Sequence, residues 1–495
     1  MEDFETVKTR LKRVNVTAPA YGNAHGVISL DGNDSVIELT GEIPYSAAEP
    51  PGWFNLRLED ANGRAIHIHN ALRTSMSFPQ DREMRSATIF PNIVVDNADG
   101  LDRDARCRSI RFGLEGWEAC FAYNYFETLD VYGPLPEELR SRLEAARYEF
   151  MREEHFDPRQ IYVANHFGTI AAFEANDRQY SIYAAIRQRF GSRDRLEAKL
   201  ELTGCIEFAE PTDLEVAIDA CWDWRRFFNQ MAMSEMPFTG MAVAASPEPQ
   251  SPTGNLYLPN DRREALRASR RRTDAYHMPL NQWEDREQLC EAMRRWLACD
   301  IERRFFRAAL DRVTARPGHV AIEDAVALCA GIDTIADLSA REALPRPVLE
   351  AMCEAAVEAA AAAHVEVDPV RVRGLLGSLQ NDDLRRKLRR MAAIAAPEAE
   401  PEAIEGWINV VIPLRLFGAH GRTPALEQDH IAGPAVDGLA GLCARFDLQS
   451  AGVPDRAGER ARSMPRLKWD EALLSLMVYR RMGTNETGAE PMGDR

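Results

Sequence analysis

The sequence of 495 residues lacks the short motifs that mark the commonest enzyme classes. It contains no Gly-x-x-x-x-Gly-Lys-Ser/Thr loop, no Gly-x-Gly-x-x-Gly run, no Gly-x-Ser-x-Gly elbow and no His-Glu-x-x-His pair. The commonest interpretations as a nucleotide-binding enzyme, an α/β-hydrolase or a zinc protease therefore fall away.

The sequence also has few features of metal, disulfide or membrane proteins. Its nine cysteines include no Cys-x-x-Cys pair and no Cys/His cluster at zinc-ligand spacing, so we expect no metal, no cofactor and reduced thiols. The N-terminal segment lacks the apolar core of a signal peptide, and no apolar run reaches the roughly 18 residues needed to cross a bilayer. We expect a soluble, cytoplasmic protein with no membrane partner.

Positive charge is scarce overall, and only five of the 60 basic residues are lysines. The formal charge of −17 argues against indiscriminate coating of nucleic acid, although it leaves room for a local basic cleft. Basic residues concentrate at 262–272 and 385–390. The second stretch gives the RNA-binding candidates Arg385, Arg386, Arg389 and Arg390, whose alternative role is a solvated face balanced by nearby acids.

Hydropathy patterns predict an α+β protein whose first part is mostly β. Turn residues between alternating runs predict hairpins over 26–39 and 54–69. Further strands are expected at 93–95, 109–114, 119–123, 160–163, 181–183 and 200–208, and a helix at 135–155. His67 and His69 fall on one face of a strand, which we interpret as a solvated face rather than half of a metal site.

Helical periodicity dominates the second part of the sequence. A helix is expected from 211 to 228, one long amphipathic stretch from 289 to 313, and further helices up to about 481. We therefore predict four regions: a mostly β region at 1–240, with a boundary between two subdomains near 135–155; a linker at 241–283, rich in Pro and Ser at 246–261; an all-α bundle at 284–482; and a disordered tail at 483–495.

Arginine precedes histidine by five positions three times, where about one such pair is expected by chance. The pairs are Arg64/His69, Arg272/His277 and Arg415/His420, with Arg159/His166 as a looser match. Only Arg415/His420 ends an apolar helical run. On a helix these side chains lie about 140° apart, so two copies around a two-fold axis would be needed to build one site from them.

The order of several segments resembles the bacterial ApeA-type abortive-infection proteins, which carry a C-terminal HEPN domain. The segments are Gly26–Leu30 with Ile37–Leu39, Ile110–Trp117, Asp213–Phe228, Leu289–Leu297 and Arg415–Gly421. The resemblance implies a mostly β sensor region that binds a phage trigger, and a HEPN-like helical bundle that dimerises and cleaves host RNA, with tRNA as one candidate, without a metal.

The same resemblance implies roles for the two motif residues. His420 would act as general acid or base, and Arg415 would hold the scissile phosphate, leaving a 2′,3′-cyclic phosphate and a 5′-hydroxyl. Leu416 stands where the family usually has a polar residue, and Pro413 is expected to kink or restart the helix. These departures keep open a non-catalytic scaffold acting with a partner effector. A β-domain module that binds a glycan or peptide is a further alternative.

Overall fold

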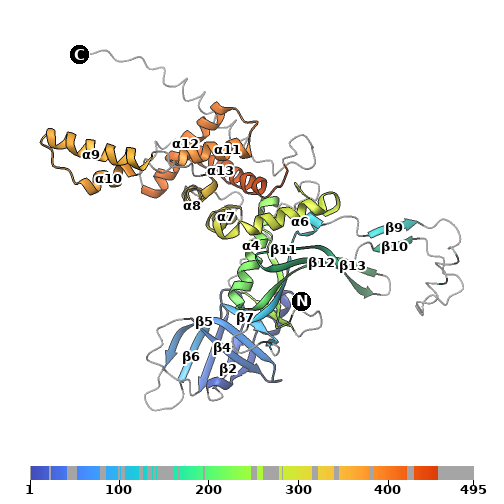
Figure 1. Ribbon diagram of the computed structural model, residues 1–495. Helices are drawn as coiled ribbons and strands as arrows, with labels where there is room; N and C mark the ends of the chain where they lie inside the picture. Colours follow the sequence, from blue (N-terminus) through green and yellow to red (C-terminus); the bar gives the residue numbers. More distant parts are fainter. Residues whose placement is uncertain are drawn as a thin grey trace.

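A computed structural model gives the fold of the chain (Figure 1). It describes residues 2–21, 24–41, 53–77, 85–98, 101, 106–121, 126–130, 137, 141, 160–164, 168–192, 195–246, 253–259, 278–280, 282–314, 322–338, 345–377, 383–420 and 429–454. The described part is mixed α and β, with the strands first and helices through the C-terminal half, which confirms the expected α+β class. The expected tail at 483–495 and most of the expected helix at 135–155 lie outside the described residues.

The first six strands close into an antiparallel barrel. They are β1 (Val14–Ala18), β2 (Ala24–Ser29), β3 (Val36–Gly41), β4 (Trp53–Asp60), β5 (Ala65–Ser77) and β6 (Arg85–Phe90). Their order is β5-β4-β1-β2-β3-β6, and β5 pairs with β6 to complete the ring. Both predicted hairpins are confirmed as β2–β3 and β4–β5. A Cβ at Gly26 would lie 1.8 Å from the Glu38 carbonyl oxygen, so β2 and β3 approach here only because residue 26 is glycine.

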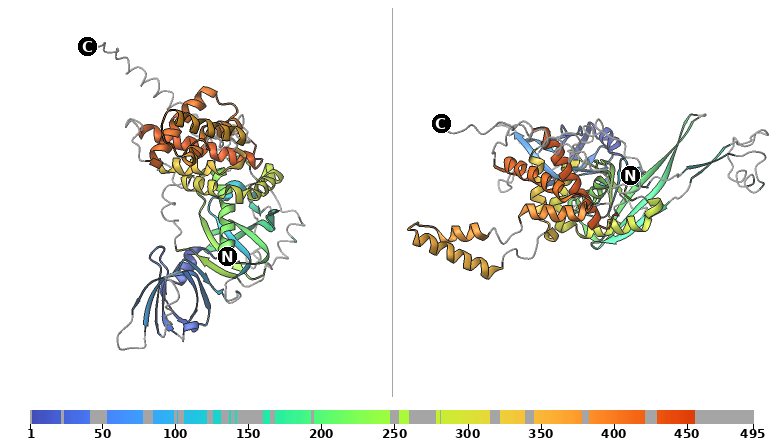
Figure 2. Two further views of the ribbon diagram at one scale, coloured as in Figure 1. Left: turned by 60° about the vertical axis from the view of Figure 1, so that its left-hand side comes forward. Right: turned by 90° about the horizontal axis from the view of Figure 1, so that it is seen from above.

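Strand β5 also leads out of the barrel into an open sheet. That sheet contains β7 (Ile93–Asp96), β8 (Cys107–Leu114), β11 (Gly168–Ala175), β12 (Arg178–Ser192), β13 (Arg195–Thr212), β14 (Phe238–Ala244) and β15 (Thr253–Tyr257). Its order is β11-β12-β13-β8-β14-β15-β7, and β7 pairs with β5. A separate two-stranded sheet joins β9 (Phe126–Asp130) to β10 (Gln160–Ala164). Figure 2 shows the barrel and the open sheet from two further sides.

Three expectations about this half are wrong. The sheet changes from barrel to open sheet between β6 and β7, not near 135–155. Part of the expected linker, at 241–244 and 253–257, is paired strand, because β14 and β15 fill the space between β8 and β7. Residues 118–121, within the strand expected at 119–123, form the short helix α2 (Glu118–Phe121).

The histidines of β5 correct a fourth expectation, because their face is covered rather than solvated. His67 is 3% exposed and His69 is 9% exposed. Their strand pairs with β7 over 66–69, and Nε2 of His69 lies 3.9 Å from Oε1 of Glu215, in the first turn of a helix that follows the sheet. Burial lowers the pKa of His69, against the opposing effects of the Glu215 and Asp213 charges.

Two of the helices that pack on the sheet are α1 (Phe4–Arg10) and α4 (Leu214–Ala232). In α1, the Asp3 carboxylate accepts a 2.7 Å hydrogen bond from the Thr6 amide and so caps the helix. Helix α4 buries Trp224 and Phe228 beside Phe112 and Trp117 of the sheet region, with ring centroids 5.2 to 6.4 Å apart in the close pairs. This aromatic cluster fixes α4 on the sheet and confirms the helix expected at 211–228.

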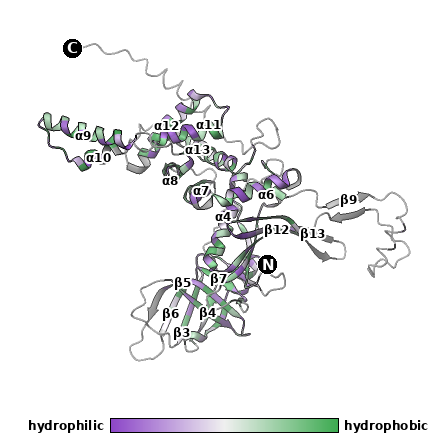
Figure 3. Cartoon of the chain, in the orientation of Figure 1, coloured by the Kyte–Doolittle hydropathy of each residue, from purple (hydrophilic) through white to green (hydrophobic). Residues whose placement is uncertain are grey.

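Within the described residues, the helical half begins with α6 and ends with α13. Its helices are α6 (Gln282–Ala298), α7 (Asp300–Thr314), α8 (Ile322–Asp333), α9 (Arg346–Ala362), α10 (Pro369–Gly377), α11 (Leu384–Ala395), α12 (Pro401–His420) and α13 (Asp429–Ser450). The expected single stretch at 289–313 is two helices, α6 and α7, separated at Cys299. Figure 3 shows hydrophilic and hydrophobic residues mixed along these helices.

Most of the buried apolar residues of the described part form two separate hydrophobic cores. The first joins the barrel, the open sheet, α4, α6 and the end of α13. The second lies among α7, α8, α11, α12 and α13, where a Cβ at Gly331 of α8 would meet the Phe306 Cα of α7 at 2.9 Å. Because α6 packs in the first core, the cores separate between α6 and α7 rather than at residue 284.

Candidate functional site

Helix α12 carries both residues of the predicted catalytic pair. It runs from Pro401 to His420 as one helix with Pro413 inside it, so the helix does not restart at Pro413. Leu414 is 1% exposed and packs in the second core, which places the following Arg415 at the edge of that core. His420 is the last residue of α12, and its side chain lies outside the described part of the structure.

Arg415 reaches from α12 to the C-terminal end of α8. Its Nη2 donates a hydrogen bond of 3.0 Å to Oδ2 of Asp333, the last residue of α8. About a third of each side chain is exposed, 34% for Arg415 and 36% for Asp333. The guanidinium is therefore already bound to an anion at a position that solvent reaches.

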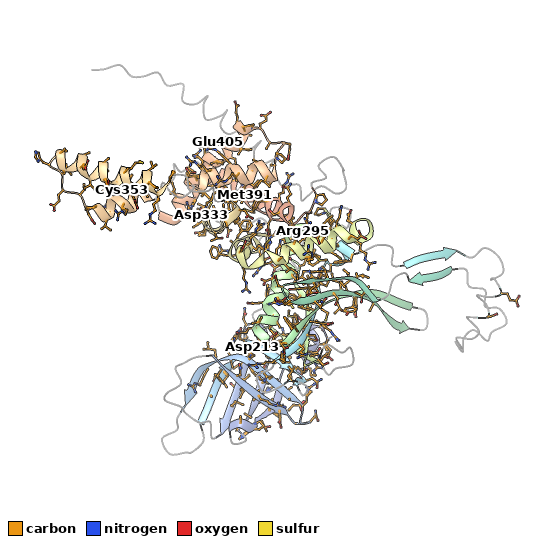
Figure 4. The ribbon with its side chains drawn as sticks, viewed as in Figure 1. Asp213, Arg295, Asp333, Cys353, Met391 and Glu405 are labelled. Carbon is orange, nitrogen blue, oxygen red and sulfur yellow. The ribbon has the colours of Figure 1, made fainter. Side chains whose placement is uncertain are left out.

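A second cation, Lys387 of α11, meets the same aspartate. Its Nζ donates to the Asp333 backbone carbonyl at 3.0 Å and lies 3.3 Å from Oδ1. The Lys387 side chain is 8% exposed, so its charge is largely withdrawn from water. Two cations at the end of α8 also offset the negative end of that helix dipole. Figure 4 labels Asp333 in the helical half.

Cys329 lies one turn before Asp333 on α8 and is buried. Burial raises the pKa of its thiol to about 12, although the nearby Arg415 charge acts in the opposite direction. The thiol therefore stays protonated near neutral pH, and Cys329 is a packing residue rather than a nucleophile.

The predicted RNA-binding arginines of α11 are engaged within the protein. Glu405 of α12 accepts hydrogen bonds from Arg389 and Arg385, and the hydrogen bond from Arg389 is the first cause that lowers the pKa of Glu405. Arg390 donates to the Leu338 carbonyl. Arg386 is exposed on the same helix, where its backbone amide donates to the capping Asp383. The stretch is a largely balanced face, the alternative role expected for it, and not a bare basic patch.

The structure does not support the other Arg/His pairs as catalytic sites. Arg64 Nη2 lies 3.3 Å from Oδ2 of Asp60, and Arg64 Nε lies 3.5 Å from Oδ1 of Asp96. His69 lies five positions further along the chain, in β5, and is buried. Arg272/His277 and Arg159/His166 lie outside the described residues. Arg64/His69 is thus part of the sheet architecture rather than an open site.

Sequence reasoning missed Asp333 and Lys387, the two residues that the structure gathers around Arg415. Together with Arg415 these residues come from three helices, α8, α11 and α12, and the Asp333–Arg415 pair spans 82 positions of sequence. One signal was available for Lys387. It falls between Leu384, Leu388 and Met391 on the apolar stripe of its helix, where a charged residue needs a partner.

Metal-binding clusters and membrane-spanning helices are both absent from the described residues. No group of three or more His, Cys, Asp and Glu side chains there is placed to hold a metal ion. Among the described helices, none combines the length and apolar character needed to cross a bilayer.

Comparison with known proteins identifies no relative of the chain. No protein-family model, curated protein or solved structure matches the chain. The residues that define the chemistry of the site are Arg415, Asp333 and Lys387, together with the position of His420 at the end of α12.

Proposed function

We propose that the chain is a metal-independent endoribonuclease of the HEPN type, in which Arg415 binds the scissile phosphate and His420 transfers the proton. The observation that supports this most directly is the ion pair between Arg415 and Asp333, with a nitrogen–oxygen distance of 3.0 Å. A guanidinium binds phosphate oxygens with the same donor geometry that it uses for carboxylate oxygens. Asp333 thus occupies the kind of position that a phosphate of RNA would take.

The proposed reaction is a transesterification within the RNA. His420 removes the proton of a 2′-hydroxyl, and the resulting 2′-oxygen forms a bond to the adjacent phosphorus. The bond from phosphorus to the 5′-oxygen breaks, and that oxygen takes a proton from an imidazolium. Arg415 offsets the charge that develops on the phosphoryl oxygens. The products are a 2′,3′-cyclic phosphate and a 5′-hydroxyl.

The site would be shared between two copies of the chain. Arg415 and His420 are five positions apart on α12, which places their side chains about 140° apart around the helix. A pair of α12 helices around a two-fold axis can present Arg415 of one and His420 of the other to a single phosphate. The resemblance extends the proposal to cytoplasmic antiphage defence, with host RNA such as tRNA as substrate and a phage protein as trigger.

The test is cleavage of total cellular RNA in excess EDTA by the wild-type chain, His420→Ala and Arg415→Ala. His25→Ala, at an exposed position of β2, serves as the matched control. We expect cuts ending in 2′,3′-cyclic phosphate from the wild type and the control, and a loss of at least about 100-fold in both site variants, the usual contribution of one catalytic group. Undiminished cleavage and toxicity in His420→Ala would overturn the proposal.

A non-catalytic scaffold that acts with a partner effector is the second candidate. It is favoured by Asp333, which engages both Arg415 and Lys387, and by Leu416, whose apolar side chain is 43% exposed where a polar partner for the pair is expected. The two candidates differ in what the chain does alone. Expression of the chain by itself after phage infection would kill cells if it is the nuclease, and would leave them viable if it is the scaffold.

A further inference from the structure

Helices α9 and α10 form an antiparallel hairpin that projects from the rest of the helical half (Figures 1 and 2). Hydrogen bonds define its turn. The Val365 amide donates to the Ala360 carbonyl, and the Val370 amide donates to Oδ1 of Asp368 at 2.9 Å, which caps the start of α10. Yet only Leu349 and Cys353 of α9 are buried, and neither belongs to the two hydrophobic cores. The hairpin therefore buries little of its own apolar surface.

A second apolar stripe of α9 is exposed to solvent, with Val348 45% and Met352 38% exposed. It consists of Val348, Met352, Ala355, Ala359 and Ala362, all exposed, at alternating steps of four and three residues. This spacing of 3.5 residues is the one that lets two helices pack along their length, and alanine permits a close approach. The stripe is rotated about 100° from the side of α9 that faces α10.

Charged residues flank this stripe with opposite signs. When two helices pack antiparallel, as α9 and α10 do, the residue just before each helix–helix contact residue points to the same side of the hairpin in both helices. Val348 precedes Leu349 of α9, and Arg371 precedes the half-buried Val372 of α10, so Arg371 borders the stripe. Glu358 borders its other edge, about 80° from the centre of the stripe. Within the described residues, neither Glu358 nor Arg371 has an ion pair.

We propose that this face, defined by the five stripe residues together with Glu358 and Arg371, binds the same face of a second copy of the chain. A two-fold axis along the hairpin sets α9 of each copy against α10 of the other. Glu358 and Arg371 lie at similar distances from the turn, so each Glu358 meets the partner's Arg371, and the contact forms twice. The face is thus complementary to itself in shape and in charge.

The size of the hairpin supports the same occupant. It spans residues 346–377, and units below about 40 residues usually need disulfides, metals or oligomerisation to be stable. Cys353, the cysteine of the hairpin, is a free thiol, and no metal-binding group occurs among the residues described. Association with a second hairpin completes a four-helix arrangement with a shared apolar interior. This inference concerns assembly alone, and it does not require nuclease activity.

Sedimentation velocity of the full chain over a range of concentrations tests the inference. We expect the wild type to dimerise, and Val348→Glu/Met352→Glu to associate at least about 10-fold more weakly. Glu350→Gln, about 160° around α9 from the centre of the stripe, should associate as tightly as the wild type. A monomeric wild type, or a Val348→Glu/Met352→Glu variant that associates as tightly as the wild type, would overturn the proposal. A variant that is monomeric but retains the wild-type circular dichroism separates lost association from misfolding.

A charge exchange identifies the contact itself. Glu358→Arg and Arg371→Glu should each weaken self-association by about 2- to 30-fold, the range for two exposed ion pairs per dimer. The double variant Glu358→Arg/Arg371→Glu should recover the wild-type dimer, and a mixture of the two single variants should form heterodimers. If the double variant stays as weak as the single ones, Glu358 does not meet the partner's Arg371. RNA cleavage is measured separately, so failure here is distinguishable from failure of the proposed nuclease.

Discussion

Arg415 Nη2 lies 3.0 Å from Asp333 Oδ2, so the arginine expected to bind RNA is held by a carboxylate of its own chain. Lys387 contacts the same aspartate from the buried side. An RNA phosphate that reaches Arg415 has to displace Asp333 or share the guanidinium with it. If Arg415 binds RNA as proposed, Asp333 competes with the substrate while it also orients Arg415.

Replacing Asp333 by Asn should strengthen RNA binding. The change removes the competing charge and keeps a side chain of similar shape. Exposed ion pairs contribute about 0.2–1 kcal/mol, so we expect RNA to bind about 1.4- to 5-fold tighter. The measurement is fluorescence anisotropy of labelled tRNA, with His420→Ala added to every variant to prevent cleavage.

The control for this measurement is Glu323→Gln. Glu323 is an exposed acid at the other end of α8, and its replacement alters the net charge by the same amount. If Asp333→Asn and Glu323→Gln change the affinity equally, only the overall charge matters. In that case Arg415 is a cap for the end of α8 and not a phosphate ligand.

Asp447 should be among the most sensitive positions of the fold. Its carboxylate is fully buried and accepts hydrogen bonds from Arg303, Arg307 and the Trp296 indole, at 2.8 to 3.0 Å. Burial acts to raise the pKa of Asp447, but the charges of Arg307 and Arg303 outweigh it and hold the pKa below its ordinary value. Asp447→Asn removes the buried carboxylate charge that faces Arg303 and Arg307, although Arg303 keeps its ion pair with the exposed Asp337. We expect the free energy of unfolding to fall by about 3–5 kcal/mol, the range for breaking a buried ion pair.

Urea unfolding followed by circular dichroism measures this loss. Asp219→Asn is the matched control, because Asp219 pairs with Arg304 at a surface where both side chains are about half exposed. Such a pair contributes at most about 1 kcal/mol. Equal effects of the two substitutions would show that the Asp447 cluster does not join α6, α7 and α13 as the geometry indicates.

Local patterns predicted much of the fold. Alternating strands around Asp31–Ser35 and Asn62–Gly63 located both barrel hairpins, and helical periodicity located α4 and most later helices. Closure of the barrel depends on pairing β5 and β3 with β6, contacts that the local pattern does not encode. The Pro- and Ser-rich segment near 246–252 concealed the strands on either side of it, because turn residues suggest a linker as readily as a hairpin.

The candidate site was predicted only in part. Arg415 was found because it lies in a short motif with His420, but motif spacing says nothing of what faces the guanidinium. Asp333 reaches it through packing of α8 on α12, a long-range contact. The same limit applies to Arg385 and Arg389 of α11, because their partner Glu405 lies on the next helix.

The burial of His69 predicts how stability changes with pH. Its pKa is lowered in the folded protein, so between the folded value and the ordinary value near 6.5 the unfolded chain binds more protons. Its contribution to stability is then complete above pH 6.5 and is lost as the pH falls through the folded-state pKa. We expect the free energy of unfolding in urea to decline from about pH 6.5 downward, and His69→Gln to reduce that decline. The exposed His25→Gln should retain the wild-type slope. A His69→Gln variant with the wild-type slope would show that another group sets the pH dependence.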